Sequence, residues 1–310
     1  MNEFELIARL SATLPTNAGV IAGAGDDCAV LDSGQAGRAL LLKTDAVVEG
    51  IHFLSSAEPE KIGHKALGRC LSDIAAMGGR ALAAVVTLAL PKNFDPAVIQ
   101  RIYDGMNALA RRHGVAMVGG ETTSNPERLL ISVALLGEVA RDKCVLRSGA
   151  KDGDALLVTG ELGGSLAGKH LEFEPRLEEG RWLAEHFAIH AMIDLSDGLA
   201  GDLRHLMERS QVGAELLARS IPISRAARLG AGTGTSAKAP LTAALTDGED
   251  YELMLTVAGR DAVPLADAWR QQFPKVRLSC IGKMTAAPGL KLLDEKGAHS
   301  LEEDGYVHFA

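Results

Sequence analysis

Residues 141–154 read Arg-Asp-Lys-Cys-Val-Leu-Arg-Ser-Gly-Ala-Lys-Asp-Gly-Asp, a polar stretch that divides the chain into two halves. Strand and helix patterns are mixed on both sides of it, so the sequence predicts an α+β (mixed α/β) fold of two domains, residues 1–146 and 147–310. Before the stretch we expect strands at 28–31, 40–45, 81–90, 115–118 and 129–139, and helices at 2–14, 59–77 and 95–114. After it we expect strands at 155–159, 251–257, 276–282 and 289–293, a short strand ending at 194, and helices at 162–171, 178–190, 260–272 and from 196 onward. Residues 230–240 are low in complexity and predict a flexible loop.

Composition narrows the possible functions. The 310 residues include 32 Lys and Arg against 40 Asp and Glu, a net charge of −8, and hydrophobic residues make up 47%, which argues against wholesale disorder. An acidic chain without basic runs is a poor candidate for binding nucleic acid, because neutralised phosphates supply most of that affinity. The longest charge-free apolar segment near the middle, 81–91, is far shorter than the ~20 residues of a membrane helix. The N-terminus has no signal-peptide pattern and no cysteines stand at CxxC spacing, so we expect a reduced, cytoplasmic protein.

Carboxylates recur beside apolar strands or helices, usually next to Gly, Ser or Thr. They are Asp26, Asp27, Asp45, Asp73, Glu121, Asp194 and Asp197. Each has an ordinary explanation when taken alone, such as a polar turn, a solvated strand end or a helix cap. Their recurrence favours a shared site, and oxygen ligands without a His or Cys cluster favour Mg²⁺ over Zn²⁺. With glycine-rich loops beside them, these residues predict a magnesium–nucleotide site.

Asp73 carries the most information of these residues. In a helix of 3.6 residues per turn it lies almost in line with Ile62 and Ala66, on an apolar face. It also lies near the helix C-terminus, where the macrodipole disfavours an anion by roughly 0.3–1 kcal/mol. A bound cation would remove both problems, and a buried Arg or Lys would do so as well.

Three other motifs in the sequence do not support a different activity. Residues 163–169 nearly match a phosphate-binding P-loop, but His170 stands where the motif needs Ser or Thr. His186 and His190 have the spacing of a zinc-protease helix, but Phe187 replaces the required glutamate. The chain also lacks the GxSxG motif of a hydrolase nucleophile elbow.

Taken together, the motifs resemble those of the thiamine-monophosphate kinases, members of the AIR-synthetase-like ATP-binding superfamily. The matching stretches run through the whole chain in family order, at residues 3–7, 25–29, 44–45, 50–53, 71–78, 119–123, 147–150, 193–199 and 248–253. They include Leu71-Ser72-Asp73-Ile74-Ala75-Ala76-Met77-Gly78 and Ile193-Asp194-Leu195-Ser196-Asp197-Gly198, and the set as a whole is highly specific. The resemblance implies an AIR-synthetase-like fold with an N-terminal mixed sheet with helices and a C-terminal α/β domain.

The resemblance also implies an activity. It is the transfer of the γ-phosphoryl group of ATP to thiamine monophosphate, giving thiamine diphosphate and ADP, the last step of thiamine diphosphate biosynthesis. Direct in-line transfer with several Mg²⁺ ions is implied, so no catalytic protein nucleophile is expected. A homodimer formed through the N-terminal domains is implied as well.

The resemblance assigns site residues by their positions in the motifs. Those implied to hold Mg²⁺ are Asp27, Thr44, Asp45, Asp73, Glu121, Asp194 and Asp197. Those implied to contact ATP are Tyr103, Gly120, Glu121, Arg147 and Ser196, with Arg147 as a clamp on phosphate. Those implied to contact thiamine monophosphate are His52, Glu249 and Tyr306.

Two positions depart from the family pattern. Glu121 stands where Asp is usual, so the charge is kept but the side chain is one methylene longer, and its metal contact could become water-mediated. Lys43 stands at a small hydroxyl position, where its main-chain carbonyl could still bind metal. The alternatives are another superfamily member, such as a cyclo-ligase, a selenophosphate synthetase or a hydrogenase-maturation protein, or a non-catalytic nucleotide sensor. A selenophosphate synthetase needs a reactive Cys near its glycine-rich loop, and Cys28, inside a predicted strand, does not suit that role.

Overall fold

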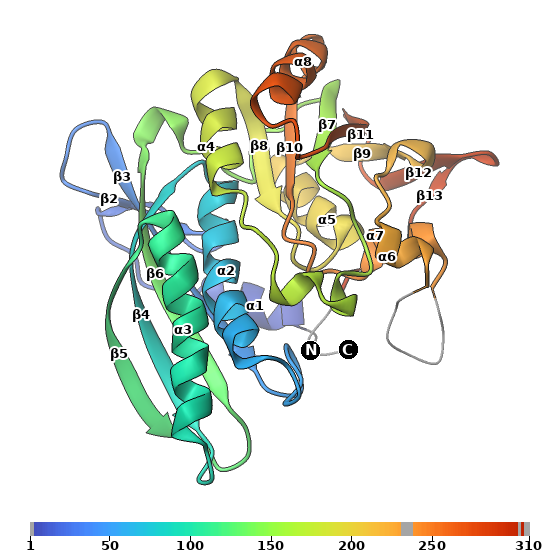
Figure 1. Cartoon of the computed structure of the whole chain (residues 1–310). Helices are drawn as coiled ribbons and strands as arrows, with labels where there is room; N and C mark the ends of the chain where they lie inside the picture. The colour runs from blue at the N-terminus through green and yellow to red at the C-terminus, as the bar shows by residue number, and fades with distance from the viewer. Residues whose placement is uncertain (1–2, 231–237, 303–304, 307–310) are drawn as a thin grey trace.

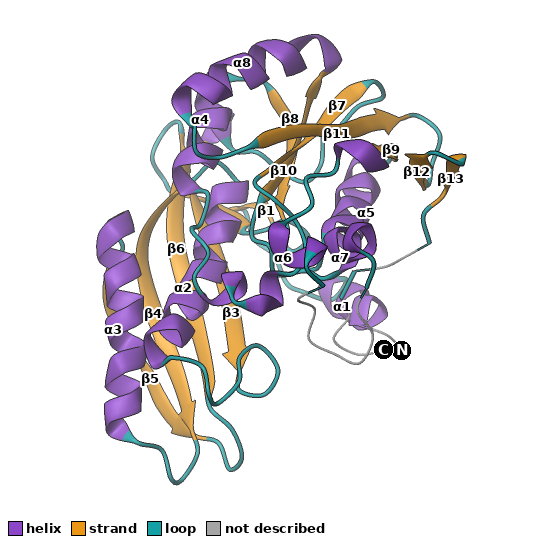
Figure 2. Cartoon of the chain, turned by 45° about the vertical axis from the view of Figure 1, so that its right-hand side comes forward, coloured by secondary structure: helices purple, strands orange, loops and turns teal. Residues whose placement is uncertain are grey.

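The computed structural model describes residues 3–230, 238–302 and 305–306, and Figure 1 follows them along the chain. Each half of the chain forms one sheet, and helices pack against both sheets (Figure 2). The predicted mixed α+β fold is therefore confirmed. The middle of the loop predicted at 230–240 lies outside the described residues. Among the described helices, none has the length and apolar character needed to cross a membrane.

The first half forms a six-stranded sheet in the order β1-β2-β3-β6-β4-β5. Its elements are α1 (Glu3–Ser11), β1 (Val20–Ala22), β2 (Ala29–Asp32), β3 (Arg38–Val48), α2 (Pro59–Ala76), β4 (Arg80–Leu90), α3 (Pro96–His113), β5 (Ala116–Ser124) and β6 (Leu130–Ala140). Neighbouring strands are antiparallel except β4 and β5, which are parallel and are connected through α3. Figure 2 shows α2 and α3 together on one face of this sheet.

The second half forms a seven-stranded sheet in the order β13-β12-β9-β11-β7-β10-β8. Its strands are β7 (Asp154–Thr159), β8 (Ile189–Asp194), β9 (Gly213–Leu217), β10 (Leu253–Ala258), β11 (Leu278–Thr285), β12 (Leu290–Asp294) and β13 (Gly297–Ser300). Its helices are α4 (Leu177–His186), α5 (Leu199–Ser210), α6 (Arg225–Arg228), α7 (Pro240–Thr246) and α8 (Ala262–Gln272).

Helix α2 joins the two halves, because it packs against β3 and β6 of the first sheet and against α4 and β8 of the second. Its buried side chains share one hydrophobic core with Leu157 and Met192 of the second sheet. The adjacent residues Leu156 and Ile193 belong to a separate core on the other face, because side chains alternate along a strand. The same alternation directs Asp194, two residues after Met192, toward α2.

The boundaries of α2 and α3 confirm the prediction from local signals. The Asp95 side chain caps α3 by accepting a hydrogen bond from Ala97 N at 2.8 Å, and the helix ends at Gly114 in the left-handed conformation. Helix α2 gives way to Gly78, whose φ of +67° is readily adopted by glycine. A β-carbon at Gly78 would lie 2.6 Å from Ala184 Cβ, so this turn also permits close packing on α4.

In the second half one predicted helix is absent, and two others are present with different ends. The helix expected at 162–171 is only two 3₁₀ turns, Ser165–Ala167 and Lys169–Leu171, because Gly163, Gly164 and Gly168 have positive φ angles that interrupt it. The helix expected at 178–190 ends at His186, and β8 begins three residues later. The helix expected from Ser196 begins at Leu199, and Asp202 rather than Ser196 accepts hydrogen bonds from the amides before it.

Two strands are longer than expected, and this corrects the position of two carboxylates. Strand β3 pairs with β6 over its full length, from Arg38 to Val48, so Asp45 lies inside the strand and not at its end. Strand β5 pairs with β4 as far as Ser124, so Glu121 also lies within a strand. The short strands β1, β9 and β13 were not predicted, because three to five residues carry little periodicity.

Candidate functional site

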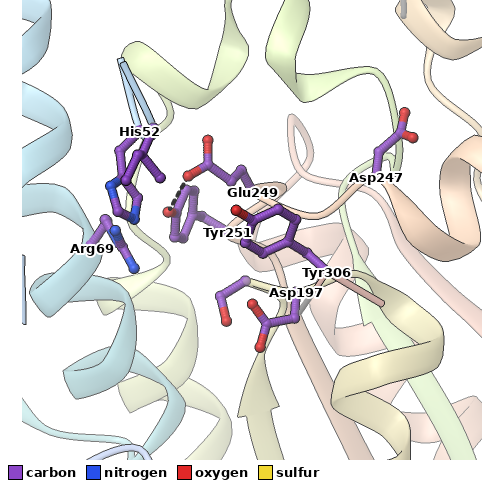
Figure 3. A pocket seen from close by; sticks show the side chains of 9 residues that line it. His52, Arg69, Asp197, Asp247, Glu249, Tyr251 and Tyr306 are labelled. Carbon is purple, nitrogen blue, oxygen red and sulfur yellow. Dashed lines mark hydrogen bonds between the residues drawn. The ribbon is translucent and has the colours of Figure 1, made fainter. Parts of the chain in front are cut away.

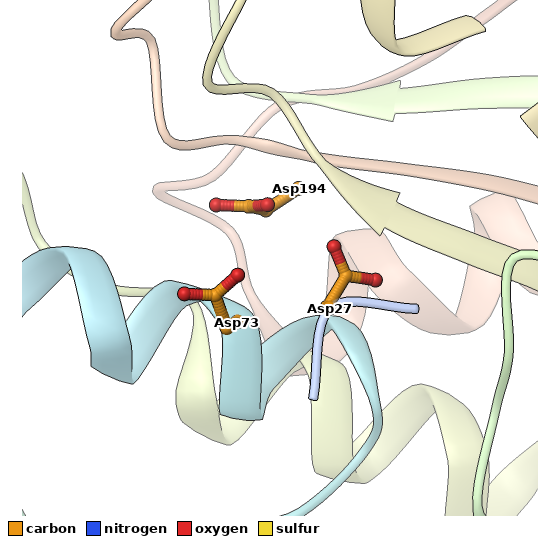
Figure 4. Close-up of side chains that lie close together, drawn as sticks. All are labelled: Asp27, Asp73 and Asp194. Carbon is orange, nitrogen blue, oxygen red and sulfur yellow. The ribbon is translucent and has the colours of Figure 1, made fainter. Parts of the chain in front are cut away.

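Three buried aspartates from distant parts of the chain form one cluster (Figure 4). Asp27 lies in the loop before β2, Asp73 in the last turn of α2, and Asp194 at the end of β8. Each offers a carboxylate oxygen that lies within 4.8 Å of the other two. All three are nearly inaccessible to solvent, with exposed fractions of 2–4%. The structure therefore brings together three of the residues predicted to bind metal.

Basic and hydroxyl side chains hold these aspartates in place. Lys43 Nζ lies 2.8 Å from Asp73 Oδ1, and Arg147 Nη2 donates to Asp27 Oδ1 at 2.7 Å. Ser72 Oγ donates to Asp194 Oδ2 at 2.6 Å. The sequence had suggested only a main-chain role for Lys43, whereas its ammonium group is an ion-pair partner of the cluster. The buried Lys partner left open for Asp73 is thus present.

The cluster retains unsatisfied negative charge despite these partners. Asp27 Oδ2 is buried and has no hydrogen-bond partner among the described residues. Burial raises the pKa of Asp73 well above its ordinary value, although Lys43 opposes this effect. Burial, together with the charge of Asp27, raises the pKa of Asp194 to about 7. A hard cation would relieve all three features, so the residues present fit a magnesium ion.

Asp45 and Thr44 lie next to each other in β3 but face opposite sides of the sheet. Asp45 shares the α2-facing side with Lys43, and its carboxylate lies 4.0 Å from Lys43 Nζ and 3.8 Å from Arg69 Nη2. Thr44 is exposed on the other side, with its hydroxyl 3.4 Å from Ser132 Oγ. Asp45 is therefore placed to extend the cluster, whereas Thr44 could reach it only through the main chain.

Three residues predicted to contact ATP or metal lie on β5 and α3. Glu121 is exposed opposite Thr87 of β4, and its side chain accepts a hydrogen bond from the Thr122 amide at 2.9 Å. Gly120 packs so closely on β4 that a β-carbon would lie 1.9 Å from the carbonyl oxygen of Val86. Tyr103 is half-buried on α3. Glu121 is therefore not one of the carboxylates that form the aspartate cluster.

A pocket beside the cluster gathers the residues predicted to bind the acceptor (Figure 3). It is lined by Ile51, His52, Arg69, Ser196, Asp197, Asp247, Glu249, Tyr251 and Tyr306. His52 comes from the first half of the chain, whereas Glu249 and Tyr306 come from the second. The structure thus places all three predicted acceptor-binding residues around one pocket, together with Ser196 and Asp197.

Lys65 of α2 contacts residues on both sides of this pocket. It is fully buried, and its ammonium group donates to the carbonyl of His52 at 2.6 Å and to Glu249 Oε2 at 2.5 Å. His170 Nδ1 lies 2.8 Å from the same nitrogen. Burial lowers the pKa of Lys65 to about 8. Burial alone would raise the pKa of Glu249, but His170 and Lys65 together lower it to about 2, so Glu249 is held as a carboxylate.

Sequence reasoning missed Lys65, Arg69 and Tyr251. Glu249 and Tyr251 have φ angles of +55° and +50°, which non-glycine residues rarely adopt, so the backbone of this turn is strained at both residues. Tyr251 stacks on Phe173 with ring centroids 4.0 Å apart. The sequence shows that positions 65 and 69 precede Asp73 at helical spacing on the same largely buried helix, but this spacing alone does not reveal what the two basic residues contact.

The structure also explains why the other motifs are not active sites. The amides of Gly163 and Gly164, which would bind phosphate in a P-loop, donate instead to the carboxylates of Asp250 and Asp247. His186 and His190 lie on different elements, α4 and β8, so they do not form a zinc pair on one helix. Burial raises the pKa of Cys28 well above its ordinary value, which opposes formation of a reactive thiolate.

Comparisons with known proteins agree with this arrangement. Residues 25–139 match the family model "AIR synthase related protein, N-terminal domain". This match and the fold thus define an AIR-synthase-related protein. The whole chain resembles the hydrogenase maturation protein HypE of E. coli at 20% identity, with a TM-score of 0.73 over 96% of this chain and 97% of that one, which supports the fold alone.

Relatives with higher sequence identity point to one enzyme family within this class. The thiamine-monophosphate kinase of Rhodopirellula baltica is 38% identical over 93% of this chain and 92% of its own length, and that of Bacillus subtilis is 33% identical over the whole of both. A solved structure, AaThiL complexed with AMPPCP and TMP, is 31% identical, with a TM-score of 0.83 over 99% of this chain and 97% of that one. The chain belongs to the thiamine-monophosphate kinase family.

Proposed function

We propose that this protein transfers the γ-phosphoryl group of ATP to thiamine monophosphate and releases thiamine diphosphate and ADP. The observation that carries the proposal is the closeness of two sites, because the pocket residues Arg69 and Ser196 lie four residues before Asp73 and two residues after Asp194. A cluster of three buried aspartates with one unsatisfied oxygen lies beside a pocket lined by His52, Glu249 and Tyr306. Similarity to a relative solved with an ATP analogue and TMP supports the choice of substrates.

Asp27, Asp73 and Asp194 would hold Mg²⁺, with Asp45 and Asp197 near enough to contribute. When bound, Mg²⁺ would neutralise the phosphate charge that otherwise keeps donor and acceptor apart. Thr44 would contribute only its carbonyl. Glu121 lies on β5, so we expect it to contact metal or phosphate where the nucleotide binds.

The chemistry requires positioning more than a protein nucleophile. An oxygen of the acceptor phosphate attacks the γ-phosphorus of ATP, and the bond from that phosphorus to the β,γ-bridging oxygen breaks as ADP leaves. Arg147 and Lys43 supply positive charge beside the aspartates. In this proposal Arg147 exchanges part of its contact with Asp27 for a phosphate oxygen, while Tyr103, Gly120 and Ser196 border the nucleotide.

We further propose that the protein is a cytoplasmic homodimer that associates through the first sheet, within a domain that ends near residue 146. Helices α2 and α3 cover one face of that sheet, whereas Leu42, Val85 and Val118 are 41–63% exposed on the other. An apolar sheet face of this kind supports self-association.

A steady-state assay tests the proposed function. Purified protein with MgCl₂ and ATP is expected to convert thiamine monophosphate to thiamine diphosphate with one ADP formed for each product molecule. Free thiamine and a panel of superfamily substrates serve as controls. Absence of product, or faster phosphorylation of free thiamine, would overturn the proposal.

A further inference from the structure

Three charged side chains follow one another at four-residue spacing along α2, namely Lys65, Arg69 and Asp73. Residues four apart are neighbours on a helix surface. Lys65 holds the main chain of His52 and the carboxylate of Glu249, and Asp73 belongs to the aspartate cluster. Arg69 stands between them and lines the pocket, so it lies on the path from the acceptor-binding residues to the cluster.

The guanidinium group of Arg69 is fixed in position but poorly satisfied. Its Nη1 donates to the carbonyl of Ala46 at 3.1 Å, which anchors the group. Its Nη2 lies 3.8 Å from Asp45 Oδ1, too far for a hydrogen bond, and its Nε is buried with no partner among the described residues. A guanidinium carries five N–H donors, of which the described residues satisfy the one that Nη1 gives to Ala46, and Nε is buried without an acceptor. The Arg69 side chain is only 15% exposed, so a donor without an acceptor costs free energy there unless a ligand supplies the acceptor.

We infer that Arg69 binds the phosphate group of the acceptor and thereby selects a phosphorylated acceptor over its unphosphorylated form. The inference rests on the proposed function and adds a residue that makes the selection. A planar guanidinium with several free donors matches the oxygens of a phosphate, and its charge is permanent. The charged and titratable groups near it are Asp45, Asp73, Glu249, Tyr251 and Lys65. None of these offers it a hydrogen bond, so a phosphate does not have to displace one.

The position of Arg69 favours the acceptor phosphate over the phosphates of the nucleotide. Arg69 shares its pocket with three predicted acceptor-binding residues, His52, Glu249 and Tyr306. Of the residues predicted to contact ATP, Ser196 lines this pocket as well, whereas Tyr103, Gly120 and Glu121 lie on α3 and β5, and Arg147 pairs with Asp27. A site built to hydrogen-bond a group rejects ligands that lack it, because its buried donors then remain unsatisfied. Free thiamine has no phosphate, so the donors of Arg69 would remain unsatisfied when it binds.

The test compares thiamine monophosphate with thiamine by calorimetric titration of the full chain without nucleotide. EDTA is present, so that no metal contributes to phosphate binding. Wild-type protein is expected to bind thiamine monophosphate about tenfold or more tightly than thiamine. Arg69→Met is expected to lose about tenfold in affinity for thiamine monophosphate, about 1.4 kcal/mol, and to bind thiamine as before. Binding of AMPPCP with Mg²⁺ is expected to be unchanged in this variant.

A matched control comes from the same helix. Lys61 lies two turns before Arg69, is half-exposed and pairs with surface glutamates, so Lys61→Met removes a positive charge from α2 outside the pocket. This variant is expected to keep the wild-type preference. If Lys61→Met loses the preference as strongly as Arg69→Met, the effect is diffuse electrostatics and the inference is wrong.

A competition experiment on wild-type protein does not depend on the folding of a variant. Millimolar inorganic phosphate in EDTA is expected to weaken binding of thiamine monophosphate but not of thiamine. An Arg69→Met protein that retains the full preference, or phosphate that competes with neither ligand, overturns the assignment of Arg69. Failure of the proposed function has a different signature, since wild-type protein would then form no thiamine diphosphate.

Discussion

Replacing Asp73 with Asn separates the role of the aspartate cluster in binding metal from its role in the fold. The substitution keeps the size of the side chain and removes one charge. At the 4.8 Å upper limit of their separation and an effective dielectric constant of about 20, each of its two pairings with Asp27 and Asp194 is repulsive by about 3 to 4 kcal/mol when the carboxylates are ionised. On the same scale the ion pair with Lys43 at 2.8 Å is attractive by about 6 kcal/mol. The lost repulsion and the lost attraction nearly cancel, so we expect stability in EDTA to change by at most about 1 to 2 kcal/mol.

The same substitution should have a large effect once metal is present. Wild-type protein is expected to melt at a higher temperature in MgCl₂ than in EDTA, because a ligand that binds only the folded state stabilises it. Asp73→Asn should lose most of this shift, and turnover should fall by about 100-fold or more. Differential scanning calorimetry and the coupled ADP assay measure the two effects. Glu60→Gln removes an exposed carboxylate from the first turn of α2 and serves as the matched control. A full magnesium shift or unchanged turnover in Asp73→Asn would refute the role of the cluster.

Other predictions concern the pocket and the sheet face. Lys65→Met should raise KM for thiamine monophosphate about tenfold with KM for ATP unchanged, because the Glu249 carboxylate loses a buried partner, while Lys61→Met should change neither. Glu249 has its pKa lowered to about 2, so its stabilising effect is complete above about pH 4.5 and is lost as pH falls toward 2. Urea unfolding should therefore show that the free energy of unfolding of wild-type protein falls by about 2 to 3 kcal/mol more than that of Glu249→Gln over that pH range. Equal decreases in the two proteins would contradict the ion pair. Leu42→Glu should convert a dimer to a monomer in analytical ultracentrifugation, and a wild-type monomer would contradict the proposed interface.

The parts of the fold that the sequence predicts well are those with local signals. The Asp95 cap and Gly114 define α3, and the apolar run of β4 defines a strand without reference to the rest of the chain. Asp45 was placed wrongly because its strand continues only by pairing with β6, which is a long-range contact. Glu121 was misplaced for the same reason, since β5 depends on its parallel partner β4.

The candidate site shows a similar division. The acidic residues could be predicted, because carboxylates beside apolar segments are unusual wherever they occur. Their basic partners could not, since Lys43, Lys65 and Arg69 meet their carboxylates only when the two halves of the chain or separate elements pack together. Their spacing relative to Asp73 or Asp45 is visible in the sequence, but their contacts are not.

The central claim is that the aspartate cluster supports direct transfer of phosphate between two bound substrates. A single-turnover experiment with protein in excess over ATP labelled at the γ-phosphate tests this claim most directly. With Mg²⁺ and thiamine monophosphate present, the account predicts that the label moves into thiamine diphosphate without accumulating on the protein, and that Asp73→Asn abolishes the transfer. Label that remains in bound ATP would indicate a nucleotide sensor, and label that accumulates on the protein would indicate a covalent intermediate. Either result would contradict the account.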